Sequence, residues 1–310
     1  MNLLKILRRS QSKGPVPLTS AVSIGMAAHG NSTTTREALE ALFASASGRY
    51  ELVLIDDHSA DDTMEVFLDA RKWHGNTKIF SFPRNLEYCE SVNAFLSHAT
   101  GEQLIFLSND ILASPAYLRE LLRSADANPD CGILRGCSNF VDNQSAEHNL
   151  PTPDCATREA YFAFAEEVAE RYRESPPLDE RFLVGDAFLV TRRVLDRIGT
   201  FDTRFRGYYG DGDFALRAQI AGFRVVLERR AFAYHRRDAN IGYLPEEERK
   251  RKLAVRHQRV GAALGEFLRK YRVPMTEASV HDIPWEELAR CKFEPALHYV
   301  APGDYSKYLF

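Results

Sequence analysis

Short apolar runs alternate with helical patterns of apolar and polar residues between residues 17 and 135. Four of these runs, rich in β-branched residues, predict strands at residues 22–26, 51–56, 78–82 and 103–108. Apolar residues at helical spacing predict helices near residues 34–46, 62–73, 90–98 and 115–127. An alternation of strands with helices is typical of βαβ units and therefore favours a parallel sheet.

Two of the predicted strands, 51–56 and 103–108, are apolar at successive positions instead of every second one. Such runs are typical of strands that are buried on both faces. We therefore expect an α/β fold with a mostly parallel sheet covered by helices on both faces. Polar residues that directly follow the strands should lie at the carboxyl edge of the sheet, where open α/β folds bind their ligands. Asp56, Asp57, Asn109 and Asp110 occupy such positions.

The second half of the chain is less regular. An irregular stretch at residues 139–156 precedes an amphipathic helical pattern, and an apolar block follows at 182–191. The pattern then predicts helices at 194–198 and 214–221 and a strand at 224–227. A charged helical stretch and an irregular tail follow residue 245. We expect an N-terminal tail at 1–17, a main domain at 18–245 with halves at 18–136 and 137–245, and a C-terminal accessory extension at 246–310.

Composition narrows the class of protein. Of the 310 residues, 45% are hydrophobic and 27% are charged, which is typical of a soluble globular protein. The net charge of -3 argues against nucleic acid as the main partner. The five cysteines form no CxxC pair, as expected of free thiols in a reducing compartment. Because no run approaches the ~20 apolar residues of a membrane span, and the N-terminal apolar piece is too short for a signal peptide, we expect a cytoplasmic protein.

Three groups of residues are candidates for chemistry. Asp56 and Asp57 cannot both cap a helix that begins several residues later, so one of them is free to accept hydrogen bonds from a nucleobase or a ribose. Asp110 is placed to coordinate a divalent cation that bridges diphosphate oxygens, although a turn aspartate is an open alternative. His235 follows an apolar run, and imidazole is an acceptable ligand for Mn²⁺, although a single histidine is usually structural.

The third acidic segment, YYGDGDF at residues 208–214, places Asp211 between two glycines. Glycines let the backbone turn sharply toward a ligand, so we expect a chemical role for Asp211. We expect Asp213 to cap the helix at 214–221. The chain contains no GxGxxG, GxxxxGK[ST], HExxH or GxSxG motif. The absence of these motifs argues against dinucleotide dehydrogenases, P-loop enzymes, zincins and α/β-hydrolases. Metal-assisted diphosphate chemistry is the remaining candidate activity.

The order of these segments between residues 21 and 235 resembles glycosyltransferase family 2, whose members have the A-type fold. The resemblance is carried by VSIGMAAHGN, ELVLIDDHSADDT, PRNLEYCESVNAFLSHATGE, FLSND, FLVGDAFLVTRRVLDRIGTFDTRF and YYGDGDFALRAQIAGFRV. FLSND stands where the family has an Asp-x-Asp metal motif, with Ser108 in place of the first Asp. Gly210 stands where the family has a Glu before its catalytic base.

The resemblance implies an inverting transfer of a sugar from a nucleotide diphosphate sugar to an acceptor hydroxyl. Asp211 would be the general base, and Asp110 with His235 would hold Mn²⁺ or Mg²⁺. The nucleotide sugar would contact Asp56, Asp57, Arg84, Asn93, Asn109, Gly185 and Asp186. The acceptor would be a glycan, a lipid-linked molecule or another hydroxyl compound, in the synthesis of a surface glycan or other glycoconjugate.

Two alternatives stay open because of the substitutions at Ser108 and Gly210. One is a nucleotidyltransferase, and the other is a degenerate sugar-nucleotide-binding module without activity. The basic helical stretch between residues 249 and 272 also has two interpretations. Its apolar stripe, Val260, Leu264 and Leu268, packs on the main domain with the charges in solvent, or the basic face contacts anionic lipid at the inner face of a membrane.

Overall fold

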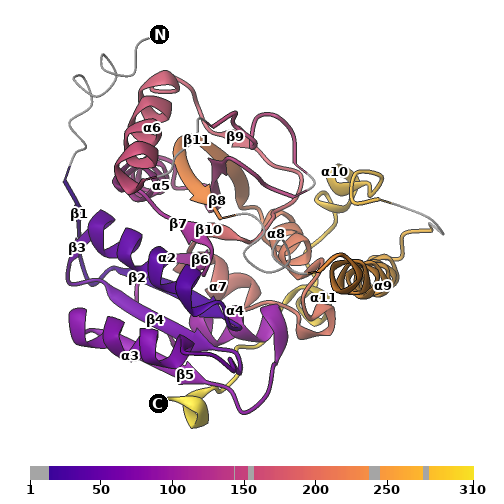
Figure 1. Ribbon diagram of the computed structural model, residues 1–310. Helices are drawn as coiled ribbons and strands as arrows, with labels where there is room; N and C mark the ends of the chain where they lie inside the picture. The colour runs from indigo at the N-terminus through magenta and orange to yellow at the C-terminus, as the bar shows by residue number, and fades with distance from the viewer. Residues whose placement is uncertain (1–13, 143, 153–156, 237–244, 275–278) are drawn as a thin grey trace.

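The computed structural model describes residues 14–142, 144–152, 157–236, 245–274 and 279–310. At its centre is a mixed sheet of nine strands in the order β5-β4-β2-β6-β10-β8-β11-β7, with β9 paired to β11 (Figure 1). The strands are β2 (Val22–Ala28), β4 (Glu51–Asp56), β5 (Thr77–Ser81), β6 (Gln103–Ser108), β7 (Ile111–Leu112), β8 (Cys131–Ser138), β9 (Leu178–Asp179), β10 (Ala187–Thr191) and β11 (Arg224–His235). Two short strands, β1 (Val16–Leu18) and β3 (Ala46–Gly48), form a separate parallel pair.

The first half of the sheet is parallel, as expected, since β5, β4, β2 and β6 run in one direction. β10 runs antiparallel to both of its neighbours, β6 and β8. The α/β prediction is confirmed, but the second half of the sheet is mixed. The four strands predicted in the first half are confirmed within two residues. The strand predicted at 224–227 was too short, since β11 continues to His235, and β8 was not predicted.

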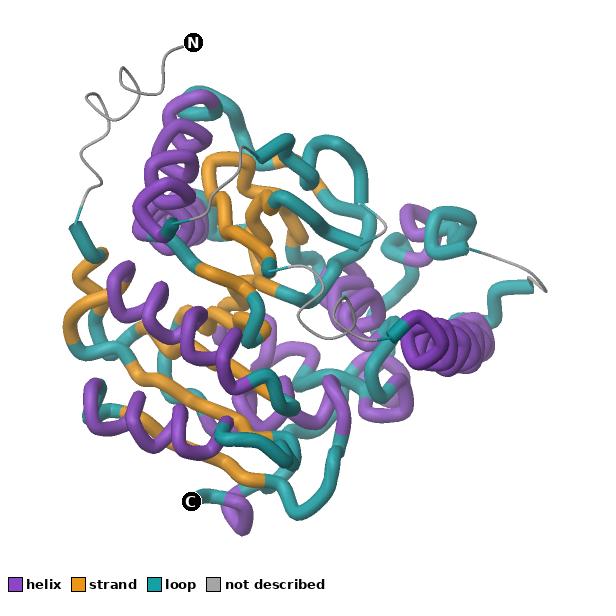
Figure 2. Tube along the Cα trace, in the orientation of Figure 1, coloured by secondary structure: helices purple, strands orange, loops and turns teal. Residues whose placement is uncertain are grey.

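Helices cover both faces of the sheet (Figure 2). The helices of the described residues are α2 (Ser32–Ser45), α3 (Thr63–Trp73), α4 (Glu87–His98), α5 (Pro115–Ala127), α6 (Arg158–Arg171), α7 (Arg192–Ile198), α8 (Gly210–Ile220), α9 (Glu246–Lys270), α10 (Trp285–Leu288) and α11 (Pro295–His298), with 3-10 turns η1 (Thr203–Phe205) and η2 (Ser306–Tyr308). The packing of β4 explains why its apolar residues occupy successive positions. Leu52 and Leu54 pack into one core, while Val53 and Ile55 pack into the other.

α8 begins four residues earlier than predicted, at Gly210. The residue before it, Tyr209, adopts the left-handed conformation with φ of 61° and is the N-cap. Asp211 and Asp213 therefore both lie in the first turn of α8. The prediction that Asp213 caps the helix is wrong, because this residue lies inside the helix and is fully buried.

The C-terminal extension packs on the main domain. Phe267 and Leu268, near the end of α9, are buried in the core that also contains residues of α4, α7 and α8. The tail returns to the edge strand β5, where Leu309 bridges Phe80 and the N–H of Phe310 donates to the carbonyl of Ile79 at 2.8 Å (Figure 1). The last residues therefore cover an edge of the sheet that pairs with no other described strand.

None of the described helices combines the length and the apolar composition that a bilayer span requires. Cys89, Cys131, Cys137 and Cys291 are free thiols, as expected, and Cys155 lies outside the described residues.

Candidate functional site

Three strand ends bring Asp110, Asp186 and His235 together. Asp110 follows β6, Asp186 precedes β10, which pairs antiparallel with β6, and His235 ends β11. His235 pairs in register with Ile111, the residue after Asp110. β6 and β11 end at this edge and β10 begins there, so the sheet topology itself makes the cluster.

The imidazole of His235 lies close to the carboxylates of both Asp110 and Asp186. Nε2 of His235 lies 3.2 Å from Oδ2 of Asp110, and Nδ1 lies 3.8 Å from Oδ2 of Asp186. Nδ1 is also 3.0 Å from the carbonyl oxygen of Phe140. Burial opposes the charge on the imidazole, but the contact with Asp110 and then the charge of Asp186 raise the pKa of His235 to about 9. The charged form of the imidazole is therefore favoured beside the two carboxylates, and His235 would lose this proton when Nε2 binds a cation.

Sequence reasoning missed Arg135, whose side chain is 2% exposed and lies in β8. Its guanidinium is 3.1 Å from Oδ1 of Asp186 and donates to the carbonyl of Val184 at 2.9 Å. A charge in a buried strand requires a partner, because its desolvation costs several kcal/mol. The single arginine in the apolar run CGILRGCS was the signal available in the sequence for such a partner.

Asp211 lies in the first turn of α8 and points toward the segment before β10. Its Oδ2 accepts the N–H of Gly185 at 2.8 Å, and Oδ1 accepts the N–H of Gly212 at 2.9 Å. Burial raises the pKa of Asp211 above the ordinary value, against these hydrogen bonds, and the charge of Asp186 adds to the rise. A carboxylate with a raised pKa is a better proton acceptor near neutral pH.

Gly185 connects Asp211 to the cluster, since the next residue is Asp186. A Cβ at Gly185 would lie 2.1 Å from Oη of Tyr88 and 3.0 Å from Cβ of Asp211. The same tyrosine hydroxyl donates to the carbonyl of Gly185 at 2.7 Å. The backbone passes between these two side chains because glycine has none of its own.

The second group of predicted residues lies at the end of β4. Oδ1 of Asp56 accepts the N–H of Ser59 at 3.0 Å. The carboxylate of Asp57 accepts the N–H groups of Leu86 at 2.6 Å and Glu87 at 3.0 Å. Burial raises the pKa of Asp57, against these two hydrogen bonds. Both carboxylates thus fix the loops that surround this edge of the sheet.

Asn109 links the two groups. Its amide donates to the carbonyl of Gly30 at 3.2 Å and to Oγ1 of Thr35 at 2.8 Å, and the N–H of Gly30 donates to Ser59. Arg84 is exposed and makes no hydrogen bond or ion pair with the described part of the chain. Asn93 is buried elsewhere, where its amide exchanges two hydrogen bonds of 2.8 Å with the backbone of Phe201.

Asp110 and His235 can be tested as ligands of a divalent cation. Within the described ranges, no three His, Cys, Asp or Glu side chains form a group able to hold a metal. The contact of 3.2 Å between Asp110 and His235 nevertheless matches the separation of about 3 Å between adjacent ligands of an octahedral ion. The contact of Nδ1 with the carbonyl of Phe140 orients Nε2 toward Asp110, as in metal-bound histidines. The pair therefore fits a cation whose other ligands come from a bound diphosphate and water.

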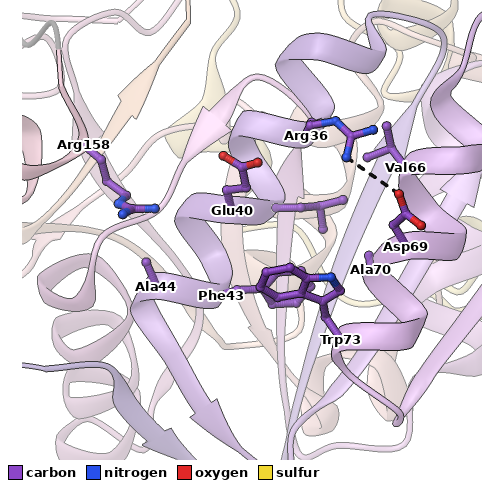
Figure 3. A pocket seen from close by; sticks show the side chains of 10 residues that line it. Arg36, Glu40, Phe43, Ala44, Val66, Asp69, Ala70, Trp73 and Arg158 are labelled. Atoms are coloured by element: carbon purple, nitrogen blue, oxygen red, sulfur yellow. Dashed lines mark ion pairs between the residues drawn. The ribbon is translucent and has the colours of Figure 1, made fainter.

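A separate pocket of about 540 Å³ lies between α2 and α3 (Figure 3). Trp73, which is 81% exposed, stacks on Phe43 there, and Arg36 lies 3.8 Å from Asp69. Its lining includes none of the predicted site residues, so the pocket is distinct from the carboxylate cluster.

The fold is that of an A-type glycosyltransferase. Residues 23–199, more than half of the chain, match the model of Glycosyl transferase family 2, and the chain belongs to this family.

Two curated relatives match parts of the chain. The undecaprenyl-phosphate 4-deoxy-4-formamido-L-arabinose transferase of Klebsiella pneumoniae is 30% identical over 92 residues, which are 29% of this chain and 28% of that protein. The O-antigen biosynthesis protein RfbC of Myxococcus xanthus is 25% identical over 239 residues, which are 73% of this chain and 18% of that protein. The chain thus spans a minor part of each relative.

A solved structure shares the fold over most of the chain. It is the mannosyltransferase PcManGT from Pyrobaculum calidifontis in complex with GDP-Man and Mn²⁺, with a TM-score of 0.57 and 16% identity. The similarity covers 92% of this chain and 75% of that one. The expected A-type fold is therefore confirmed.

Proposed function

We propose that the protein transfers a sugar from a nucleotide diphosphate sugar to an acceptor hydroxyl, with inversion at the anomeric carbon. The observation that carries the proposal is the position of Asp211. Its carboxylate is held by Gly185, one residue from Asp186, which lies beside the Asp110–His235 pair. A proton acceptor and a candidate diphosphate site are therefore adjacent.

In this proposal Asp211 accepts the proton of the acceptor hydroxyl while that oxygen attacks the anomeric carbon. The bond from the anomeric carbon to the diphosphate oxygen breaks, and the nucleoside diphosphate leaves with the bonding electrons. Burial, which raises the pKa of Asp211, makes the carboxylate more basic than a solvated aspartate. Gly185 and Gly212 hold the carboxylate in one orientation through their N–H groups.

Asp110 and His235 are the residues that would hold Mn²⁺ or Mg²⁺. When bound, the cation stabilises the negative charge that develops on the departing diphosphate. Asp186 lies beside His235 and is held by Arg135, so it faces the same region. A donor complexed with Mn²⁺ in a structure of the same fold supports this assignment.

The nucleoside end of the donor lies in this proposal along the loops after β4, β5 and β6. Asp57 contacts the base with Asp56 beside it, Asn109 lies between these loops and the metal pair, and Arg84 is free to reach a phosphate. Asn93 is not part of this proposal, because its amide is engaged in the interior.

For the acceptor, we propose a glycan precursor or a lipid-linked molecule. The names of the two relatives, which include undecaprenyl phosphate and O-antigen biosynthesis, support this choice. The protein would act on the cytoplasmic side, with peripheral membrane contact through α9. Residues 249–252 of that helix, Arg-Lys-Arg-Lys, are exposed and could lie near anionic headgroups.

The proposal is tested by incubating the protein with a panel of nucleotide sugars and Mn²⁺ or Mg²⁺ and measuring the nucleoside diphosphate released. A transferase releases it from its own donor, slowly with water and faster with an acceptor. A nucleotidyltransferase would instead form pyrophosphate from a nucleoside triphosphate and a sugar phosphate. A module without activity would bind a donor and release nothing. The anomeric configuration of the product, read by NMR, tests inversion.

A further inference from the structure

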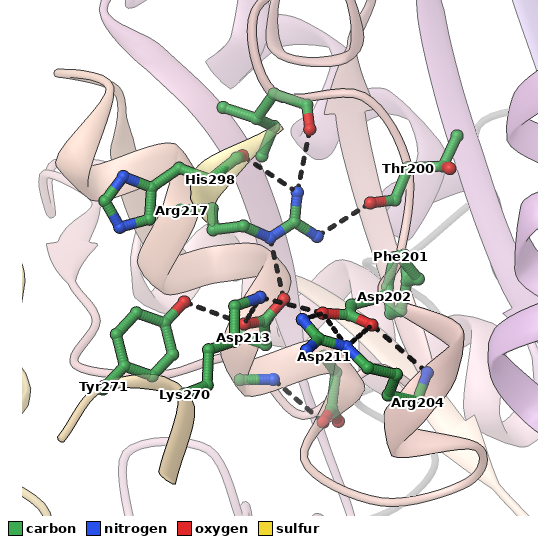
Figure 4. A network of polar contacts seen from close by, with 12 residues as sticks. Thr200, Phe201, Asp202, Arg204, Asp211, Asp213, Arg217, Lys270, Tyr271 and His298 are labelled. Carbon is green, nitrogen blue, oxygen red and sulfur yellow. Dashed lines mark hydrogen bonds and ion pairs between the residues drawn. The ribbon is translucent and has the colours of Figure 1, made fainter. Parts of the chain in front are cut away.

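A buried group of charges lies behind Asp211, on the other side of the first turn of α8 (Figure 4). Asp213 is fully buried there, and its carboxylate accepts hydrogen bonds from Arg217 at 2.7 Å and Tyr271 at 2.8 Å and pairs with Lys270. Residues two apart in a helix are about 200° apart around its axis. Asp211 therefore faces Gly185 while Asp213 faces the interior.

Lys270 is the last residue of α9, in the C-terminal extension. Its side chain is 2% exposed, and Nζ lies 3.0 Å from Oδ2 of Asp202 in addition to its contact with Asp213. Two carboxylates, Asp202 and Asp213, thus face two buried cations, Arg217 and Lys270, and Asp202 also pairs with the exposed Arg204 at 2.6 Å. A buried charge that loses its partner is strongly unfavourable, so each member restrains the others.

Arg217, on the opposite side of this network from Lys270, is fixed by hydrogen bonds to backbone carbonyl groups. The guanidinium of Arg217 donates to the carbonyls of Ile198 at 2.8 Å and Thr200 at 2.7 Å. Asp213 is therefore held by Arg217 on one side and by Lys270 on the other. Since Asp213 and Asp211 share one helical turn, a shift of one carries the other with it.

We propose that Lys270 is a positioning residue, which holds the first turn of α8 through Asp213 and so keeps Asp211 on the N–H of Gly185. The proposal rests on the proposed function, in which Asp211 accepts the proton of the acceptor. It makes the end of α9 a part of the catalytic unit, although the chain of the extension begins more than thirty residues after Asp211.

The test is the steady-state kinetics of Lys270→Met with an identified donor. A misplacement of about 1 Å in an active site lowers rates about 100-fold, so we expect kcat to fall at least about tenfold. The KM for the donor should stay within about twofold, because the proposed donor contacts lie on other loops. The acid limb of the kcat profile should move to lower pH, since a loosened turn admits water to Asp211. Lys270→Arg keeps the charge and should recover most of kcat.

Two control variants separate positioning from general stability. Arg269→Met removes a cation from the same turn of α9 at an exposed side chain, and it should leave kcat unchanged. Leu118→Ala makes a cavity in the core on the other face of the sheet, and it should lower the melting temperature without lowering kcat. If Lys270→Met does not fold, the same kinetics are measured on Lys270→Met with Asp202→Asn, which keeps the buried charges balanced.

The proposal is overturned if kcat of the folded variant stays within about twofold of the wild type, or if Leu118→Ala lowers kcat as much. Failure of the underlying function has a different signature, because Asp211→Asn would then retain kcat. A loss of kcat in Asp211→Asn without a loss in the Lys270 variant rejects only the role of Lys270.

Discussion

Replacing Gly185 by alanine should disturb the site through one defined clash. The new Cβ would lie 2.1 Å from Oη of Tyr88, far inside van der Waals contact. The ring of Tyr88 cannot swing away, because it packs edge-on against Phe106 and Phe201 with centroids at 5.9 Å in each case. The backbone at residue 185 must therefore move, and its N–H leaves the carboxylate of Asp211.

The magnitude follows from overpacking. Forcing an extra carbon into a packed interior costs typically about 1–3 kcal/mol of unfolding free energy. We expect Gly185→Ala to cost an amount in this range and to lower the transfer rate about 100-fold. Tyr88→Phe removes Oη, and the nearest ring atom, Cζ, then lies 3.1 Å from the new Cβ. The contact of the new Cβ with Cβ of Asp211, at 3.0 Å, is also present. In that background Gly185→Ala should cost less than about 1 kcal/mol, because these two contacts need only small shifts.

The assay is a double-mutant cycle of the wild type, Gly185→Ala, Tyr88→Phe and the double variant. The free energy of unfolding of each protein is measured by urea denaturation, together with its transfer rate. The two substitutions should be coupled, with the double variant more stable than the sum of the single losses predicts. An equal cost of Gly185→Ala in both backgrounds would refute the reasoning, since the tyrosine hydroxyl would then not be the group that the alanine meets.

Three further predictions concern metal, pH and membrane. Calorimetric titration of Mn²⁺ should show tighter binding with a nucleoside diphosphate present than without it, and Asp110→Ala should abolish the difference; equal affinities would contradict the shared site. Burial raises the pKa of Asp211, so the folded protein favours the protonated form of this side chain. The resulting stabilisation is fully present below the unfolded pKa of about 4 and is lost as the pH rises through the folded pKa. Asp211→Asn should therefore raise the melting temperature at pH 7, with a gain that shrinks toward pH 4, and a gain independent of pH would reject this assignment. The protein should sediment with anionic vesicles at low salt but not at high salt, and less after Arg249, Arg251 and Lys252 are changed to Gln; failure to sediment at low salt would leave α9 without a role at the membrane.

The fold was predictable where local patterns carry the information. The unbroken apolar run of β4 indicated a strand buried on both faces, and its alternate residues do pack into two separate cores. The site was partly predictable for the same reason, since polar residues after parallel strands share one edge. Asp110 and His235, 125 positions apart in the chain, meet there.

The remaining parts depend on partners that no local spacing reveals. Arg135 pairs with Asp186 across two strands, and β8, which carries the arginine, was not predicted. Asp213 was expected to be a cap because its neighbours are turn residues. The spacing of Asp213 and Arg217, four residues apart, is typical of an ion pair on a helix and was the available signal. Lys270, in the C-terminal extension, is a second cation paired with Asp213, and the sequence pattern indicated only that this region is charged.

The most direct test of the central claim compares Asp211→Asn with the wild type at saturating nucleotide sugar, acceptor and cation. The measurement is the initial rate of nucleoside diphosphate release together with donor affinity, with Asp196→Asn, at an exposed aspartate of α7, as the matched control. We expect a loss of at least about 100-fold in the rate for Asp211→Asn with donor affinity retained, and no change for Asp196→Asn. A rate for Asp211→Asn close to that of the wild type would contradict the assignment of Asp211 as the catalytic base.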